Sequence, residues 1–121
     1  MKLILVDDNA IFRDNLKMYL EIELNHKVIA EASSGEEFLK LQNIAEAEVI
    51  LMDINMGAIN GLEATQLILR EFHHLKIIAV TFDIQNSFLR RIIESGFKGF
   101  VNKTDVYKML NSTLEDVYNG K

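Results

Sequence analysis

The sequence predicts an α/β protein built on one parallel sheet with helices on both faces. Short segments rich in Ile, Leu and Val occur at 2–6, 27–32, 49–52, 76–80 and 99–101. Most of them are continuously apolar, which is typical of strands buried on both faces. The stretches between them repeat apolar residues at helical spacing. Strands that alternate with helices favour a parallel sheet of five β–α units.

Each expected helix carries an apolar stripe or a start signal. The stripes are Phe12, Leu16, Tyr19 and Leu20; Ala64, Leu67, Ile68 and Phe72; Phe88, Leu89, Ile92 and Ile93; and Val106, Met109, Leu110, Leu114 and Val117. Ser34 and Asn60 are each followed three residues later by glutamate, a pattern that begins helices. Asn60–Gly61 is also a hairpin-turn pair, but no strand pattern follows, so we interpret it as a helix start. Gly120 is expected to end the last helix.

Composition excludes several classes of protein. The 121 residues suit one domain, and 49% of them are hydrophobic, as in globular proteins. A net charge of −5 without a Lys/Arg cluster disfavours nucleic-acid binding by this segment. The absence of cysteine excludes disulfides, thiolate metal sites and cysteine nucleophiles. No apolar run approaches the roughly 20 residues of a membrane span, and the start does not resemble a signal peptide. We therefore expect a cytoplasmic protein without a membrane partner.

The candidate site residues follow the first, third, fourth and fifth expected strands. In open parallel sheets, ligands bind beyond the carboxyl ends of the strands. The residues expected at that edge are Asp7 and Asp8 after the first strand, Asp53 after the third, Thr81 after the fourth and Lys103 after the fifth. The sequence therefore predicts a cluster of three carboxylates, one hydroxyl and one ammonium group.

This set of side chains favours phosphoryl chemistry with a divalent cation. Neighbouring carboxylates raise one another's pKa, and a hard cation relieves their repulsion. Oxygen-only ligands indicate Mg²⁺, with Mn²⁺ or Ca²⁺ as alternatives. Mg²⁺ commonly shares its shell with a phosphate, and a carboxylate such as Asp53 can form an acyl phosphate. Lys103 would then neutralise phosphoryl oxygens while the Thr81 hydroxyl donates to one of them.

Taken singly, each of these residues has a structural explanation. Asp7 and Asp8 fit a helix N-cap, Lys103 fits a surface lysine and Thr81 fits a strand end. Their occurrence in register after adjacent strands is what favours a functional site.

Five segments resemble the motifs of the receiver domain of bacterial two-component response regulators. They are "LVDDN", "VILMDINM", "NGLEAT", "IIAVT" and "SGFKGFVNK", in the family's order and spacing. The resemblance covers essentially the whole chain and implies one receiver domain over 1–121. The implied fold is the flavodoxin-like or CheY-like (βα)5 fold with strand order 2-1-3-4-5. The two ends of the chain are most similar to NarL-type regulators, in which a helix-turn-helix DNA-binding output domain usually follows. On this resemblance we expect the chain to be a receiver without its output domain, or a single-domain relative.

The resemblance also implies a role for each matching residue. Asp53 is the expected phosphoacceptor for a sensor histidine kinase. Asp7 and Asp8, with Asp53 and the backbone carbonyl of Asn55, are expected to hold Mg²⁺ or Mn²⁺. The remaining roles are Thr81 as switch hydroxyl, Phe100 as switch aromatic (a core position being the alternative) and Lys103 as the lysine that neutralises the phosphoryl group.

The implied function is a signalling switch rather than an enzyme acting on other molecules. Phosphorylation of Asp53 is expected to draw Thr81 inward, move Phe100 and change the face formed by the fourth helix, fifth strand and fifth helix. That face would form a homodimer or control an output domain, through which alone the protein would contact DNA. Its only catalysis would be its own phosphorylation and dephosphorylation.

Three positions depart from the family pattern, and they affect the site rather than the fold. Thr104 replaces the usual proline after the lysine, so the Lys103–Thr104 peptide is expected to be trans, or cis under strain. Gly57 replaces a proline and loosens its loop. Phe82 replaces a small residue and is expected to narrow access to Asp53, while Asp83 leaves the lifetime of the phosphate open.

Two other functions are weighed against the switch. A Mg²⁺-dependent aspartyl-phosphate hydrolase usually has its nucleophile after the first strand with a second aspartate two positions on, which disfavours it here. A pseudo-receiver that is never phosphorylated and acts only through protein contacts is disfavoured by the complete polar set but supported by Phe82 and Thr104.

Overall fold

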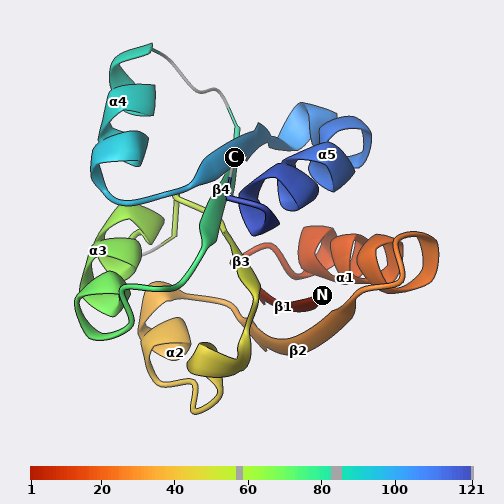
Figure 1. Cartoon of the computed structure of the whole chain (residues 1–121), viewed down its shortest axis with the longest axis horizontal. Helices are drawn as coiled ribbons and strands as arrows, with labels where there is room; N and C mark the ends of the chain where they lie inside the picture. Colours follow the sequence, from red (N-terminus) through yellow and green to blue (C-terminus); the bar gives the residue numbers. More distant parts are fainter. Residues whose placement is uncertain (57–58, 83–85, 121) are drawn as a thin grey trace.

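Five parallel strands form a single sheet in the part of the chain that the computed structural model describes, residues 1–56, 59–82 and 86–120 (Figure 1). The strands are β1 (Lys2–Val6), β2 (Lys27–Ala32), β3 (Val49–Met52), β4 (Ile77–Thr81) and β5 (Gly99–Asn102). Their order is β2-β1-β3-β4-β5, which confirms the predicted order. The expected strand limits are correct to within one residue.

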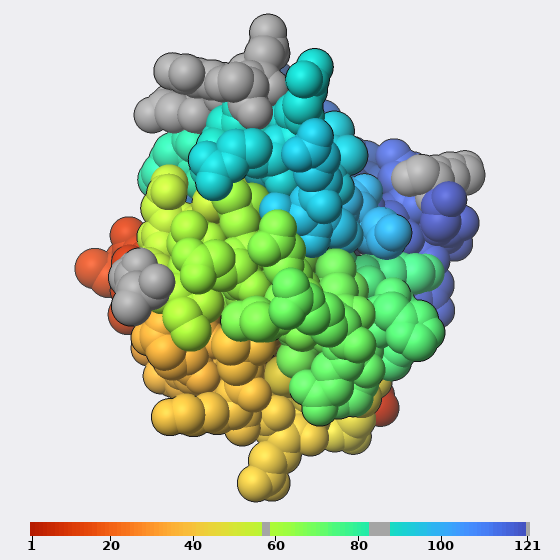
Figure 2. All heavy atoms as spheres, turned by 90° about the vertical axis from the view of Figure 1, so that its left-hand side faces the viewer, coloured from red at the N-terminus to blue at the C-terminus, as the bar shows by residue number. Residues whose placement is uncertain are grey.

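Helices cover both faces of the sheet, as the alternating pattern predicts. They are α1 (Ala10–Met18), α2 (Gly35–Leu39), α3 (Gly61–Glu71), α4 (Asn86–Glu94) and α5 (Val106–Tyr118). The shorter helical segments are a π-helical turn that extends α1 (Tyr19–Glu23) and the 3₁₀ turns η2 (Ile44–Glu46) and η3 (Lys103–Asp105). Helices α1 and α5 lie on one face, whereas α2, α3 and α4 cover the other and form a continuous layer of side chains (Figures 1 and 2).

Alternate residues of the central strands build two separate cores. On β1, Leu3 and Leu5 pack with the helices α1 and α5, while Ile4 and Val6 pack with the layer of α2, α3 and α4. All four side chains are buried. Because β1 is buried on both faces, its continuous apolar sequence is explained. The edge strands β2 and β5 are only partly buried, so the prediction of burial on both faces is wrong for these two strands.

The predicted helix starts are confirmed. The side-chain oxygen of Ser34 accepts a hydrogen bond from the Glu37 N–H at 3.0 Å, and that of Asn60 accepts from the Glu63 N–H at 2.9 Å. Gly61 then begins α3 directly against the backbone of Asp53, where a Cβ atom would overlap the Asp53 carbonyl oxygen. The Asn60–Gly61 pair therefore starts a helix and lets it approach the end of β3.

Among the described residues, no helix is both long enough and apolar enough to cross a membrane.

Candidate functional site

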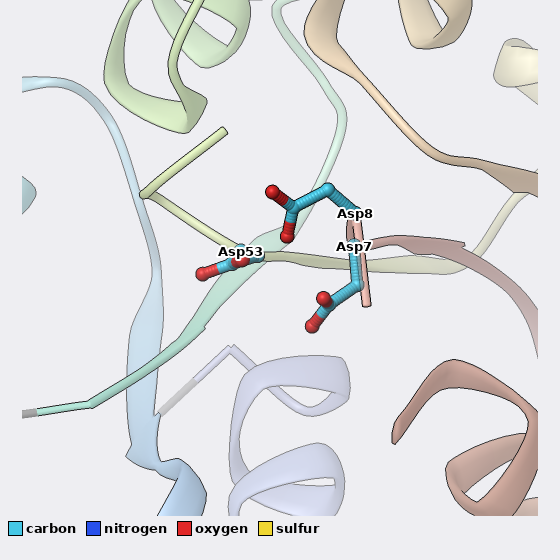
Figure 3. A group of neighbouring side chains, drawn as sticks. All are labelled: Asp7, Asp8 and Asp53. Carbon is cyan, nitrogen blue, oxygen red and sulfur yellow. The ribbon is translucent and has the colours of Figure 1, made fainter. Parts of the chain in front are cut away.

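Three aspartates meet at the carboxyl ends of the neighbouring strands β1 and β3 (Figure 3). One carboxylate oxygen from each of Asp7, Asp8 and Asp53 lies within 4.8 Å of the other two. Val6 and Met52 are paired in the parallel register, and the Asp53 N–H donates to the Val6 carbonyl at 2.8 Å. Backbone pairing therefore sets the distance between the two acidic segments.

Lys103 reaches into this cluster from the turn η3 that follows β5. Its Nζ atom lies 2.7 Å from Asp7 Oδ2 and 3.5 Å from Asp53 Oδ2, and its side chain is only 6% exposed. The rings of Phe12 and Phe82 lie 4.5 and 5.4 Å from the same nitrogen, within cation–π range. One buried ammonium group thus bridges two buried carboxylates.

The charge of Asp53 is poorly compensated. Its side chain is buried, with an exposed fraction of 5%. Burial and, next, the negative charge of Asp7 raise the pKa of Asp53 from 3.8 to about 6, although Lys103 and the Asn55 N–H act in the opposite direction. The site therefore has an excess of negative charge that a bound cation would relieve, which agrees with the expected donor set for Mg²⁺.

Thr81 is the last residue of β4, the strand beside β3, and its side chain is fully buried. Its hydroxyl oxygen has no hydrogen-bond partner among the described residues. Most buried hydroxyl groups are hydrogen-bonded, so this hydroxyl lacks the partner that its burial normally requires; its role as a switch hydroxyl stays a prediction.

Asn55 and Phe100 occupy positions compatible with their expected roles, which remain predictions. The Asn55 N–H donates to Asp53 Oδ1 at 3.4 Å, so this backbone lies beside the acidic cluster. Phe100, on the edge strand β5, is 42% exposed. The alternative that Phe100 is a core residue is therefore wrong.

The departures from the family pattern have a partial structural account. The Lys103–Thr104 peptide is trans, in agreement with one of the two expectations. Phe82 is 52% exposed with its ring near the Lys103 ammonium group, so it lies at the rim of the site. Gly57 and Asp83 lie outside the described residues.

Two residues at the start of α1 contact the site without having been predicted there. Phe12, expected only as a core position, makes a cation–π contact with the ammonium group of Lys103. Arg13 donates from Nη1 to the Asp7 carbonyl at 2.6 Å. The signal available in the sequence was the short interval from Asp7 to the expected helix, whose first turns must lie beside the acidic pair.

Comparison with known proteins agrees with this geometry. The response regulator receiver domain family matches residues 3–114. Response regulator UvrY of Escherichia coli (strain K12) is 33% identical over 121 residues, which are 100% of this chain and 56% of that protein. Response regulator GacA of Pseudomonas syringae pv. syringae (strain B728a) is 35% identical over 103 residues, or 85% of this chain and 48% of GacA. The chain thus spans about half the length of the curated relatives it matches.

A solved structure of a response regulator is also similar to this chain. The two-component response regulator of the LuxR family from Aurantimonas sp. SI85-9A1 superimposes with a TM-score of 0.92 at 26% identity, over 99% of this chain and 86% of that one. The predicted likeness to NarL-type receivers is confirmed by these relatives. The chain therefore belongs to the response regulator receiver domain family, the signalling domains of two-component systems, whose general function is that of a phosphorylation switch and not of a conventional enzyme.

Proposed function

We propose that Asp53 accepts a phosphoryl group from a sensor histidine kinase, with Mg²⁺ bound at the aspartate cluster. The observation that carries this proposal is the cluster of three carboxylates, two of which, Asp7 and Asp53, are buried and bridged by the ammonium group of Lys103. Such a group is costly to bury, and a cation together with a phosphate would neutralise it.

Asp7, Asp8 and Asp53 would hold the cation, with the Asn55 carbonyl completing the set. Their oxygen-only chemistry fits Mg²⁺, and Mn²⁺ is the alternative. When bound, the cation neutralises the oxygens of the incoming phosphoryl group. A carboxylate oxygen of Asp53 attacks phosphorus, the bond from phosphorus to the histidine nitrogen breaks, and an acyl phosphate forms on Asp53.

Lys103 and Thr81 would stabilise the product and transmit the signal. The Lys103 ammonium exchanges its carboxylate partner Asp7 for a phosphoryl oxygen. The Thr81 hydroxyl, which lacks a partner among the described residues, donates to another phosphoryl oxygen. Phe100 then turns toward the space that Thr81 leaves, and the face of α4, β5 and α5 changes. This is a shift between two packings, driven by the tighter binding of phosphate to one of them.

The changed face is proposed to form a homodimer and to control an output domain. The curated relatives are response regulators about twice as long as this chain, and a LuxR-family regulator is among the similar structures. A helix-turn-helix DNA-binding domain is the output we propose, with transcription as the regulated process and the cytoplasm as the location. The receiver itself would catalyse only the gain and loss of its own phosphate.

The test is incubation with Mg²⁺ and acetyl phosphate, followed by intact-mass measurement. We expect one base-labile phosphoryl group on the wild-type protein and none on Asp53→Asn. Asp105→Asn, which alters an exposed carboxylate outside the cluster, is the matched control and should be phosphorylated normally. An unmodified wild-type protein would favour the pseudo-receiver. Sustained hydrolysis of an unrelated phosphate ester would favour the hydrolase.

A further inference from the structure

The side chain of Arg13 contacts the backbone of the acidic pair and not its carboxylates. Its Nη1 donates to the Asp7 carbonyl oxygen at 2.6 Å. The Asp7 N–H is bonded to the Ala32 carbonyl of β2 at 3.0 Å, but Asp7 lies beyond the end of β1. The guanidinium group therefore takes the place at the Asp7 carbonyl that a strand partner would otherwise fill.

Glu31 of β2 holds the other side of the same guanidinium group. Glu31 Oε1 lies 3.0 Å from Arg13 Nε, and the exposed fractions of the two side chains are 28% and 16%. Glu31 itself is fixed by the pairing of β2 with β1, where it lies opposite Leu5. Arg13 is thus bonded at two separate N–H groups, one to the sheet and one to the acidic segment.

The contact has a direct consequence for the orientation of Asp8. The Asp7 carbonyl belongs to the peptide unit that joins Asp7 to Asp8, so its position sets the plane of that peptide. The Asp7 carboxylate is oriented separately, because its Oδ1 accepts from the Asn9 N–H at 2.8 Å. A fixed peptide plane restricts the directions in which the exposed side chain of Asp8 can leave the chain toward the cluster.

We propose that Arg13, held by Glu31, is a positioning residue that orients the Asp7–Asp8 peptide, and with it the side chain of Asp8, for the divalent cation. The inference rests on the proposed function, since it assigns a role toward the cation of that site. Removal of a residue that orients metal ligands typically weakens metal binding by about 10–100-fold.

The positioning role and simple electrostatics predict changes of opposite sign. Arg13 carries a positive charge near a cation site, so its neutralisation should by itself tighten cation binding. If Arg13 orients the ligands, its neutralisation weakens binding instead. Arg13→Lys separates the two effects further, because it keeps the charge but lacks the rigid fork that bonds two partners at once.

The experiment measures the Mg²⁺ dissociation constant by calorimetry for the wild type, Arg13→Gln and Arg13→Lys, without any phosphodonor. Lys17→Gln is the matched control, because Lys17 also pairs with Glu31, at 3.3 Å, but is not bonded to an acid of the cluster. We expect binding about tenfold weaker in both Arg13 variants and unchanged or slightly tighter in Lys17→Gln. In the metal-free protein, the backbone ¹⁵N signal of Asp8 should shift in the Arg13 variants only.

Equal or tighter Mg²⁺ binding by folded Arg13→Gln would overturn the proposal, as would wild-type affinity in Arg13→Lys. If Arg13→Gln does not fold, Arg13→Lys alone decides. A wild-type protein that binds no Mg²⁺ would instead overturn the metal site of the proposed function, and this inference with it.

Discussion

The ammonium nitrogen of Lys103 lies 2.7 Å from Asp7 Oδ2, and both side chains are almost completely buried. This ion pair joins the turn after β5 to the end of β1, although the strands β4 and β3 lie between them in the sheet. Because Asp7 is also an expected cation ligand, Lys103 and a bound cation would share one carboxylate. The position of Lys103 should therefore depend on whether the cation and a phosphate are present.

Removal of Lys103 should destabilise the metal-free protein strongly. Lys103→Ala leaves the buried carboxylates of Asp7 and Asp53 without their counter-ion, a change that typically costs about 3–5 kcal/mol of unfolding free energy. Urea unfolding with and without Mg²⁺ measures the effect, and Mg²⁺ should restore part of the loss. Lys108→Ala, at an exposed position of α5, is the control. Equal stability of both variants would show that Lys103 does not compensate the cluster.

The stability of the metal-free fold should fall as Asp53 ionises. Its pKa of about 6 in the folded protein lies above the ordinary value of 3.8, so the folded state binds the proton more tightly than the unfolded state. The stabilisation is complete below pH 3.8 and is lost as the pH rises through about 6. Because each tenfold difference in proton affinity corresponds to about 1.4 kcal/mol, the loss is about 3 kcal/mol.

Asp53→Asn removes this pH dependence, and its unfolding free energy relative to wild type should rise between about pH 3 and about pH 7 by about that amount. Urea titrations across the range measure it, with Asp105→Asn as the control. A constant difference across the range would mean that the pKa of Asp53 is not raised by the fold.

Thr81→Val should separate stability from signalling. The buried hydroxyl lacks a partner among the described residues, so its replacement by a methyl group of similar size should stabilise the unphosphorylated protein by about 1 kcal/mol. In the same variant, phosphorylation should no longer shift the NMR signals of the face formed by α4, β5 and α5. Thr81→Ser should retain these shifts. Destabilisation by Thr81→Val would indicate that the hydroxyl is already bonded.

Gly61→Ala should damage both the fold and the site. A Cβ atom at this position overlaps the Asp53 carbonyl oxygen, and overpacking of this kind costs about 1–3 kcal/mol, more than the gain of up to about 1 kcal/mol from the helix propensity of alanine. Thermal unfolding measures the effect. Arg70→Ala, at an exposed position of the same helix, is the control. A Gly61→Ala protein of wild-type stability would rule out the tight contact between α3 and β3.

Much of the fold and of the cluster could be predicted because both depend on local patterns. Apolar runs such as 49–52 specify central strands, and parallel pairing brings the residues after them to one edge. Asp7, Asp8, Asp53 and Lys103 meet there as predicted.

Other features depend on side-chain directions and on contacts between distant segments, which strand and helix patterns do not contain. The exposure of Phe100 follows from the edge position of β5. The placement of Arg13 depends on Glu31, which lies 18 residues further along the chain. The π-helical turn at Tyr19–Glu23 shares the apolar spacing of the preceding helix, so the sequence pattern does not distinguish it.

The most direct test of the central claim is to locate the phosphoryl group. After phosphorylation by acetyl phosphate with Mg²⁺, borohydride reduction converts an acyl-phosphorylated aspartate to homoserine, which peptide mass spectrometry can assign to one position. We predict conversion at Asp53 alone, dependent on Mg²⁺. Conversion at Asp7 or Asp8, or none at all, would contradict the account.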